Sequence, residues 1–170
     1  VGKQSMESVS NLQILNEIVE FGTQLESLKS SSSFTFRALM SSWYDRTSLL
    51  RDCFDVMEPV NAVRESLLRS VASETTQGKL FLARHLHRIA RNARRNERME
   101  IACAAMCRLR CVTSDHTIAS LAKREDWIRW EFEEAKCLWD RDERRRAMAI
   151  GKRLCHVISR EKKSSSLRKY

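Results

Sequence analysis

The stretch DWIRWEFEEAKCLWDRDERRRAMAIGKRLCHVI, from Asp126 to Ile158, decides the fold because it contains two amphipathic helix patterns joined by a short polar segment. Apolar residues in its first half recur at i, i+4, i+7 and i+11, a spacing that places them on one face of an α-helix. They are Ile128, Phe132, Ala135 and Trp139. The second half has a similar helical spacing, at i, i+3, i+7 and i+11, with Ala147, Ile150, Leu154 and Ile158.

The polar segment between the two patterns has the composition of a helix start. It places Asp140 at a plausible N-cap position and Glu143 three residues later, where a carboxylate suits the positive end of a helix dipole. The small side chains of Ala135 and Ala147 would let the two helix backbones approach closely. These features predict an antiparallel helix pair of the kind that repeats in an α-solenoid.

The composition of the whole chain favours the same fold class. Among 170 residues there are only four glycines and one proline, too few for the many tight turns of a β-sandwich or barrel. We therefore predict an all-α chain, an α-solenoid of antiparallel helix pairs resembling tetratricopeptide or HEAT repeats. Such an array buries its apolar faces repeat by repeat.

We predict three segments. Residues 1–33 hold an N-terminal helix, capped by Ser10 or Asn11, and a serine-rich loop whose run Ser30–Ser33 is a candidate phosphorylation site. Residues 34–163 form the helical-repeat segment, and residues 164–170 form a flexible tail. The chain begins at Val1 without a methionine and stops within a polar tail, so we expect it to be a fragment of a longer protein.

Further helices are expected within the repeat segment. Their approximate ranges are 34–51, 58–72, 77–95 and 99–112, followed by a short helix or turn at 117–123. Pro59 suits the first turn of the second of these helices, where a missing backbone N–H costs little. Trp43 is expected to be a large buried anchor of the first.

Arginine dominates the charge. Lys and Arg outnumber Asp and Glu by 31 to 22, which gives a formal net charge of +9. The helix expected after residue 76 carries an arginine stripe opposite its apolar face, and we predict that this stripe is the exposed contact surface. Its members are Arg84, Arg88, Arg91 and Arg95.

Neither a membrane nor a secretory location is favoured. No stretch approaches the roughly 20 apolar residues that span a bilayer. Six cysteines occur without a CxxC pair and without a secretory leader, which indicates a reducing intracellular compartment.

No catalytic, cofactor-binding or metal-binding residues are predicted. Cys103, Cys107 and Cys111 share a helix face, but zinc ligands usually come in close pairs from two elements, so core packing is the better interpretation. His85 and His87 lie two residues apart and point to different faces, and neighbouring Cys155 and His156 diverge in the same way. The isolated glycines cannot cradle phosphate, and no GxSxG motif is present. A helical enzyme with a reactive thiol remains an alternative that cysteine labelling would test.

The basic residues leave a nucleic-acid-binding module as the main alternative. The arginine stripe and the run Arg144–Arg146 could contact phosphates. A charge run without stacking aromatics is weak support for that function. The three tryptophans between residues 127 and 139 are spaced as packing residues rather than as a stacking platform.

The same residues resemble a known kinase region. Glu131–Ile158 is similar to the helical FAT region of ATM-type kinases, members of the phosphatidylinositol 3-kinase-related kinases. Glu58–Arg64, with the sequence EPVNAVR, resembles the Glu-Pro-Val-x-Ala-Leu-Arg start of a preceding helix, and Leu82–Ile101 resembles the intervening pair. The arginine-rich insertions and the segment before Trp43 depart from that pattern.

This resemblance implies a non-catalytic scaffold segment of a nuclear serine/threonine kinase of the DNA-damage response. The expected partners are the rest of the same kinase chain and a second copy in a homodimer, with weak nucleic-acid binding as a further contact. No cofactor is expected. Within the segment we predict a structural core made of Trp43, Trp127, Phe132, Ala135, Trp139, Ala147 and Leu154.

Overall fold

The computed structural model describes the backbone of residues 2–28, 33–47 and 53–167, and this part of the chain contains eight helices. Their bounds are α1 Gly2–Leu28, α2 Ser33–Arg46, α3 Phe54–Ala72, α4 Thr76–Arg95, α5 Met99–Thr113, α6 His116–Leu121, α7 Arg124–Asp140 and α8 Arg144–Leu167. None of the described helices is both long enough and apolar enough to cross a bilayer.

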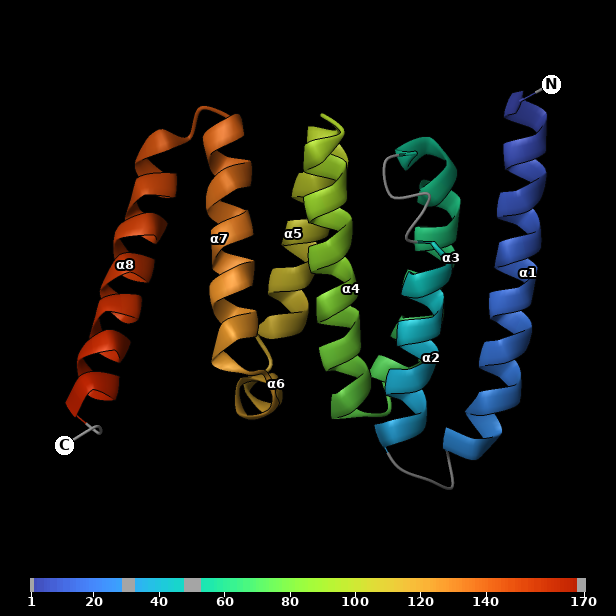
Figure 1. Ribbon diagram of the computed structural model, residues 1–170, viewed down its shortest axis with the longest axis horizontal. Coiled ribbons are helices and arrows are strands. Elements are labelled where there is room, and N and C mark those ends of the chain that lie inside the picture. The colour runs from blue at the N-terminus through green and yellow to red at the C-terminus, as the bar shows by residue number, and fades with distance from the viewer. Residues whose placement is uncertain (1, 29–32, 48–52, 168–170) are drawn as a thin grey trace.

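The helices stand side by side in one elongated array. Figure 1 shows α1 at one end and α8 at the other, with α4 near the middle. Helix α4 packs against α3, α5, α6 and α7, whereas α8 packs against α7. The helices form antiparallel pairs, which confirms the predicted all-α solenoid.

Two helix pairs are joined by the same kind of turn. Glu97, between α4 and α5, and Asp142, between α7 and α8, have positive φ angles of 60° and 63°. The residue after each of them donates its backbone N–H to a carbonyl five residues earlier: Arg98 to Ala93 and Glu143 to Leu138, both at 2.9 Å. These hydrogen bonds close the ends of α4 and α7. The predicted N-cap at Asp140 is wrong, because Asp140 is the last residue of α7.

The turn between α3 and α4 depends on a cap and a close contact. The Thr75 hydroxyl accepts a hydrogen bond from the Gly78 backbone N–H at 3.0 Å. A Cβ atom at Gly78 would lie 2.8 Å from the carbonyl carbon and oxygen of Val71. Glycine therefore allows the first turn of α4 to rest on the end of α3.

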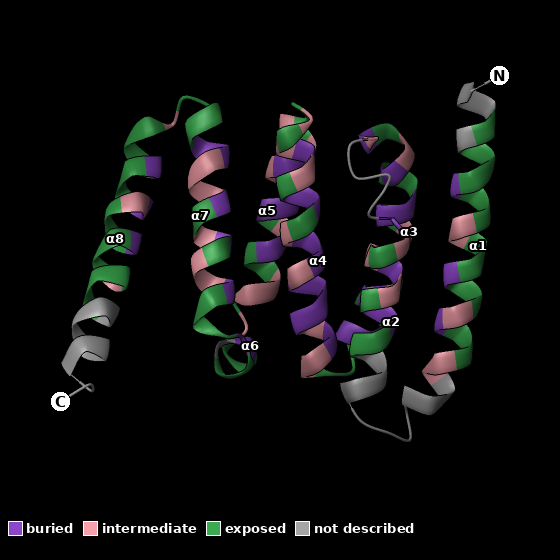
Figure 2. Cartoon of the chain, viewed as in Figure 1, coloured by how far each residue is buried: buried purple, intermediate pink, exposed green. Residues whose placement is uncertain are grey.

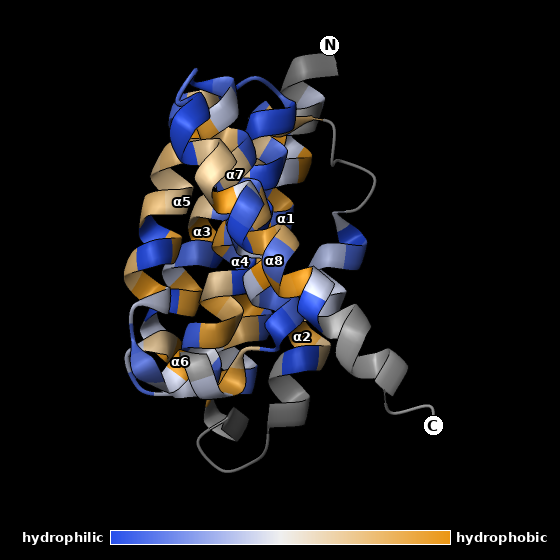
Figure 3. Cartoon of the chain, turned by 90° about the vertical axis from the view of Figure 1, so that its left-hand side faces the viewer, coloured by the Kyte–Doolittle hydropathy of each residue, from blue (hydrophilic) through white to orange (hydrophobic). Residues whose placement is uncertain are grey.

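Buried apolar residues form two separate clusters. The larger one joins α1 through α7 around Trp43, Leu68, Leu86 and Leu109. The smaller one lies between α7 and α8 and consists of Leu138, Ala147, Ile150 and Leu154, with Ile128 and Ala135 packed against it. Figure 3 shows that the turns at the upper ends of the helices are mostly hydrophilic.

Several predicted boundaries differ from the structure. α1 begins at Gly2 rather than at a cap near Ser10, and α3 begins at Phe54, so Pro59 lies beyond the first turn. α8 continues to Leu167, past the predicted start of the tail at residue 164. α2 ends at Arg46, before the expected end near residue 51. Of the predicted serine loop, residues 30–32 lie outside the described residues, and Ser33 begins α2.

Candidate functional site

The structure splits the predicted arginine stripe of α4 into two parts. Arg84 faces α7, where its Nη2 lies 2.8 Å from Oδ2 of Asp126. Arg88, Arg91 and Arg95 are exposed and lie on the α2–α3 side of α4, where all three line one cavity. The stripe is therefore not one continuous surface, because part of it stabilises helix packing.

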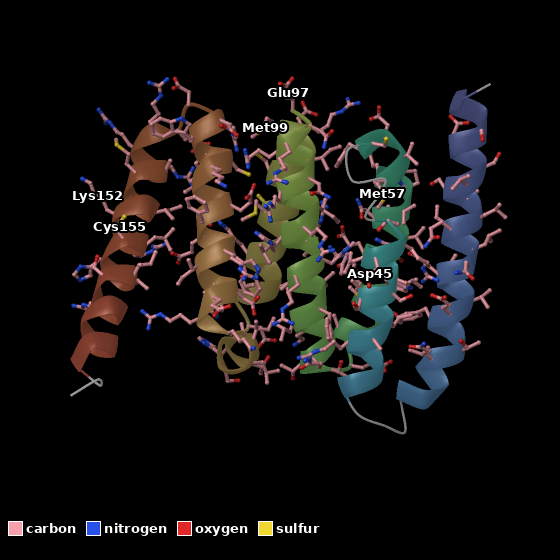
Figure 4. All side chains as sticks on the ribbon, viewed as in Figure 1. Asp45, Met57, Glu97, Met99, Lys152 and Cys155 are labelled. Carbon is pink, nitrogen blue, oxygen red and sulfur yellow. The ribbon has the colours of Figure 1, made fainter. Side chains whose placement is uncertain are left out.

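That cavity has a volume of about 220 Å³ and opens between α2, α3 and α4. Its walls consist of Tyr44, Thr47, Met57, Asn61, Arg64, Arg88, Arg91, Asn92 and Arg95. Among the described residues, no carboxylate lines it. Figure 4 labels Met57 on α3 and Asp45 on α2, which help to locate the cavity beside α4. We call this feature the arginine cavity.

The inner wall of the arginine cavity is a buried ion pair. Arg64 of α3 and Glu17 of α1 are both fully buried. The Arg64 Nε donates to Glu17 at 2.7 Å, its Nη1 donates to the Thr47 hydroxyl at 3.1 Å, and its Nη2 donates to the Trp43 carbonyl at 2.7 Å. Glu17 neutralises the guanidinium, and the contacts of Arg64 with Glu17 of α1 and Trp43 of α2 join three helices.

Beside this pair, the partly buried Tyr44 and the fully buried His85 form a hydrogen-bonded chain. Nε2 of His85 lies 3.1 Å from the Asn61 carbonyl, which only accepts, so Nε2 carries the proton. Nδ1 therefore accepts from the Tyr44 hydroxyl at 3.0 Å. Burial lowers the pKa of His85 to about 3 and raises the pKa of Tyr44 to about 12, so both groups are neutral at physiological pH.

Arg88 covers the exposed side of this chain. Its guanidinium carbon lies 3.4 Å from the centre of the Tyr44 ring, a cation–π contact. The stacking fixes Arg88 over the phenol ring at the mouth of the arginine cavity. The side chains of Arg91 and Arg95 make no ion pair or hydrogen bond within the described part of the chain.

Several other arginines contact carboxylates on neighbouring helices. Arg94 of α4 lies 2.6 Å from Glu133 and 3.4 Å from Asp140, both on α7. Arg110 of α5 pairs with Glu134 of α7. Further pairs between helices or with interhelical turns are Arg46–Glu20, Lys79–Asp115, Arg98–Asp55, Arg108–Glu65 and Arg153–Glu131. Part of the basic charge of the chain thus serves in packing between helices.

The predicted core residues have different environments. Trp43, Ala147 and Leu154 are buried, and Trp127 and Ala135 are partly buried against the two clusters. The prediction is wrong for Phe132 and Trp139, which are both 53% exposed. α8 packs on a neighbouring face of α7, so these two rings lie under Lys136 and Arg144 instead.

The cysteines offer no metal centre within the described residues. Cys107 and Cys111 are exposed, so the prediction that all three α5 cysteines pack in the core is wrong. Cys103 is partly buried, and Nη1 of Arg141 lies 3.8 Å from its Sγ. Burial raises the pKa of Cys137 to about 12, which keeps that thiol protonated and a poor nucleophile.

Glu17, Arg64 and His85 were not predicted as a linked group. Each lies in a helix pattern with no local motif for a buried pair, and Glu17 and Arg64 are 47 residues apart. The one available signal was that Arg64 ends the EPVNAVR stretch on the inward side of α3, at the spacing of Val60, Leu68 and Val71.

An array of antiparallel helix pairs defines a class of protein, the α-solenoid segments. Within that class, the sequence matches the family model of the FAT domain over residues 3–165, so the chain belongs to the FAT domain family. FAT domains are non-catalytic helical regions of phosphatidylinositol 3-kinase-related serine/threonine kinases. Comparisons with curated proteins and with solved structures gave no match.

Proposed function

We propose that this chain is a scaffold segment of an ATM-like serine/threonine kinase that acts in the nucleus in the DNA-damage response. The observation that carries the proposal is the FAT match over nearly the whole chain, together with the ATM-like stretch EPVNAVR. Arg64, the last residue of that stretch, joins α3 to α1 and α2 through its buried contacts. The stretch therefore acts as a packing motif, as a scaffold requires.

The exposed apolar residues of α1 support a role in stacking. Figure 2 shows the buried positions of α1 on the side toward α3 and exposed positions on the other side. Five large apolar side chains of this helix are between 43% and 67% exposed, namely Val9, Leu12, Leu15, Ile18 and Val19. A solenoid repeat normally buries such a row against a neighbouring repeat. We infer that this row contacts another part of the same kinase chain, and that a second copy adds contacts elsewhere.

The test uses the complete kinase chain that carries these residues. The variant Leu12→Gln/Leu15→Gln/Val19→Gln should increase proteolytic cleavage in the segment and lower substrate phosphorylation after DNA breaks. Leu121→Gln is the control, because Leu121 is also exposed but lies on α6. Unchanged proteolysis and activity in the triple variant would contradict the stacking role. A parent chain without a kinase domain would contradict the proposed function as a whole.

A further inference from the structure

The arginine cavity brings together two arginine side chains that have no carboxylate partner among the described residues. Elsewhere in the described chain several arginines pair with carboxylates of neighbouring helices, among them Arg84, Arg94, Arg108 and Arg153. Arg91 and Arg95 are one helical turn apart, line the same cavity and have no such partner among the described residues. Two adjacent exposed guanidiniums repel each other, and an anion between them would relieve that repulsion.

The remaining walls of the arginine cavity suit an anion that carries several acceptor atoms. Asn61 and Asn92 add neutral amides, and no carboxylate from the described part of the chain faces the space. Arg64 at the inner wall is already matched by Glu17, so it contributes little net charge. The cavity has a volume of about 220 Å³. This volume suits one anionic side chain rather than a large ligand.

Binding of single-stranded nucleic acid is not favoured at this cavity. Unspecific single-strand binding uses open aromatic rings on which bases stack. Tyr44 is the one aromatic residue among the described residues that line the cavity, and Arg88 covers its ring at 3.4 Å. The lining residues can therefore contact phosphate groups but do not offer an open ring for stacking.

We propose that the arginine cavity binds the phosphorylated serine or threonine side chain of a peptide segment. A phosphomonoester carries about −1.5 to −2 charges and three acceptor oxygens, enough to engage both unmatched guanidiniums at once. Arginine presents paired N–H groups that match phosphate oxygens, and clusters of arginines are a recurring means of phosphopeptide recognition. This inference is independent of the proposed kinase scaffold role and would hold for the 170-residue chain alone.

The test measures binding of two fluorescent peptide pools to the 170-residue chain by fluorescence polarisation at physiological salt. Both pools have random residues around a central serine, and only one pool is phosphorylated. We expect binding of the phosphorylated pool alone, and a loss of about tenfold or more in affinity for Arg91→Gln/Arg95→Gln. Both side chains are exposed, so this variant should keep its helical circular dichroism.

The matched control is Arg145→Gln/Lys152→Gln, which removes the same charge from exposed positions on α8 and should leave binding unchanged. Figure 4 labels Lys152, far from α4. An equal loss in both double variants would overturn the proposal, because it would show unspecific charge attraction. Equally tight binding of a glutamate-centred pool or a single-stranded oligonucleotide would also overturn it, as would full displacement by inorganic phosphate at the concentration of the peptide. Failure of the phosphorylated pool to bind would exclude it directly.

Discussion

At the residue scale, two tryptophans with similar sequence contexts have opposite environments. Trp43 is fully buried and packs against Phe21, with ring centres 6.2 Å apart, whereas Trp139 is 53% exposed under Arg144. Helical spacing predicts a core position for both. The periodicity of α7 correctly identifies a helix, but it does not specify which of two adjacent faces the next helix covers.

This difference predicts that replacing the two tryptophans by alanine lowers the free energy of unfolding by different amounts. Trp43→Ala should lower the free energy of unfolding by roughly 3–5 kcal/mol, because it empties a filled core site. Trp139→Ala should cost less than about 1 kcal/mol, since it removes a half-exposed ring. Urea unfolding of the two variants provides the measurement. Similar costs for both would mean that Trp139 is buried by a contact that the described chain lacks.

His85 predicts how stability changes with acidity. Its pKa is about 3 in the folded chain and near 6.5 in the unfolded chain, so between these values the unfolded state binds the extra proton. The contribution of His85 to stability is therefore complete above about pH 6.5 and falls as the pH is lowered. Near pH 4.5 the protonation of His85 in the unfolded state lowers the free energy of unfolding by roughly 3 kcal/mol.

The measurement is the melting temperature at several pH values between about 7 and about 4.5. His85→Leu should be less stable at neutral pH but lose less stability on acidification. His87 adds a smaller effect of the same sign, because burial also lowers its pKa. His116→Asn is the control, since His116 is exposed, and it should follow the parent curve. An unchanged pH slope in His85→Leu would show that His85 is not buried in its neutral form.

At the scale of elements, the helix ends decide how the pairs are joined. Glu97 and Asp142 adopt positive φ without being glycines, and they close equivalent turns. By contrast, position 78 requires glycine because it has no side chain. The first turn of α4 rests directly on the backbone of Val71 and Ala72, which leaves no room for a Cβ atom. A Cβ atom added at Gly151 of α8 would have no described neighbour within 4 Å.

These two glycines form a matched pair for one substitution. Gly78→Ala should destabilise the chain by roughly 1–3 kcal/mol, because α3 and α4 must move apart. Gly151→Ala should stabilise it by roughly 0.5–1 kcal/mol, since alanine favours the helix and meets no described neighbour. Thermal unfolding of both variants shows whether each substitution raises or lowers the melting temperature. Stabilisation by Gly78→Ala would contradict the close contact between these helices.

At the scale of the whole molecule, each helix depends mainly on its neighbours. The buried Glu17–Arg64 pair holds α1 against α3, and the separate small cluster holds α8 against α7. Stability in such arrays is nearly a sum over repeats and their interfaces. A substitution that destabilises the helices at one end of the array should therefore leave the helices at the other end unchanged.

Glu17→Ala tests this local behaviour because it leaves the Arg64 guanidinium buried without its partner, at a cost of roughly 3–5 kcal/mol. Hydrogen exchange should become faster in α1, α2 and α3 and stay unchanged in α7 and α8. Glu20→Ala is the matched control on α1. Its ion pair with Arg46 is about 30% exposed on both sides, so its loss should cost much less. Uniformly faster exchange in Glu17→Ala would indicate one cooperative unit instead of an array.

The candidate site was predictable only in part. The helical spacing of Arg88, Arg91 and Arg95 placed them on one face of α4, and they do line one cavity. The same spacing included Arg84, which pairs with Asp126 of α7. Helical periodicity describes one helix and its own faces, so it cannot show which face a distant carboxylate reaches.

The sequence by itself determined the all-α class, the helix pairs and the family, because the scarcity of glycine and proline and the ~3.6-residue spacing are local properties of the chain. Only the tertiary structure decided which charges are buried, paired or open. Glu17 meets Arg64 and Arg94 meets Glu133 across helices, at 47 and 39 residues of separation. Such contacts depend on how helix faces rotate and pack against each other, and that geometry also leaves Arg91 and Arg95 open beside the arginine cavity.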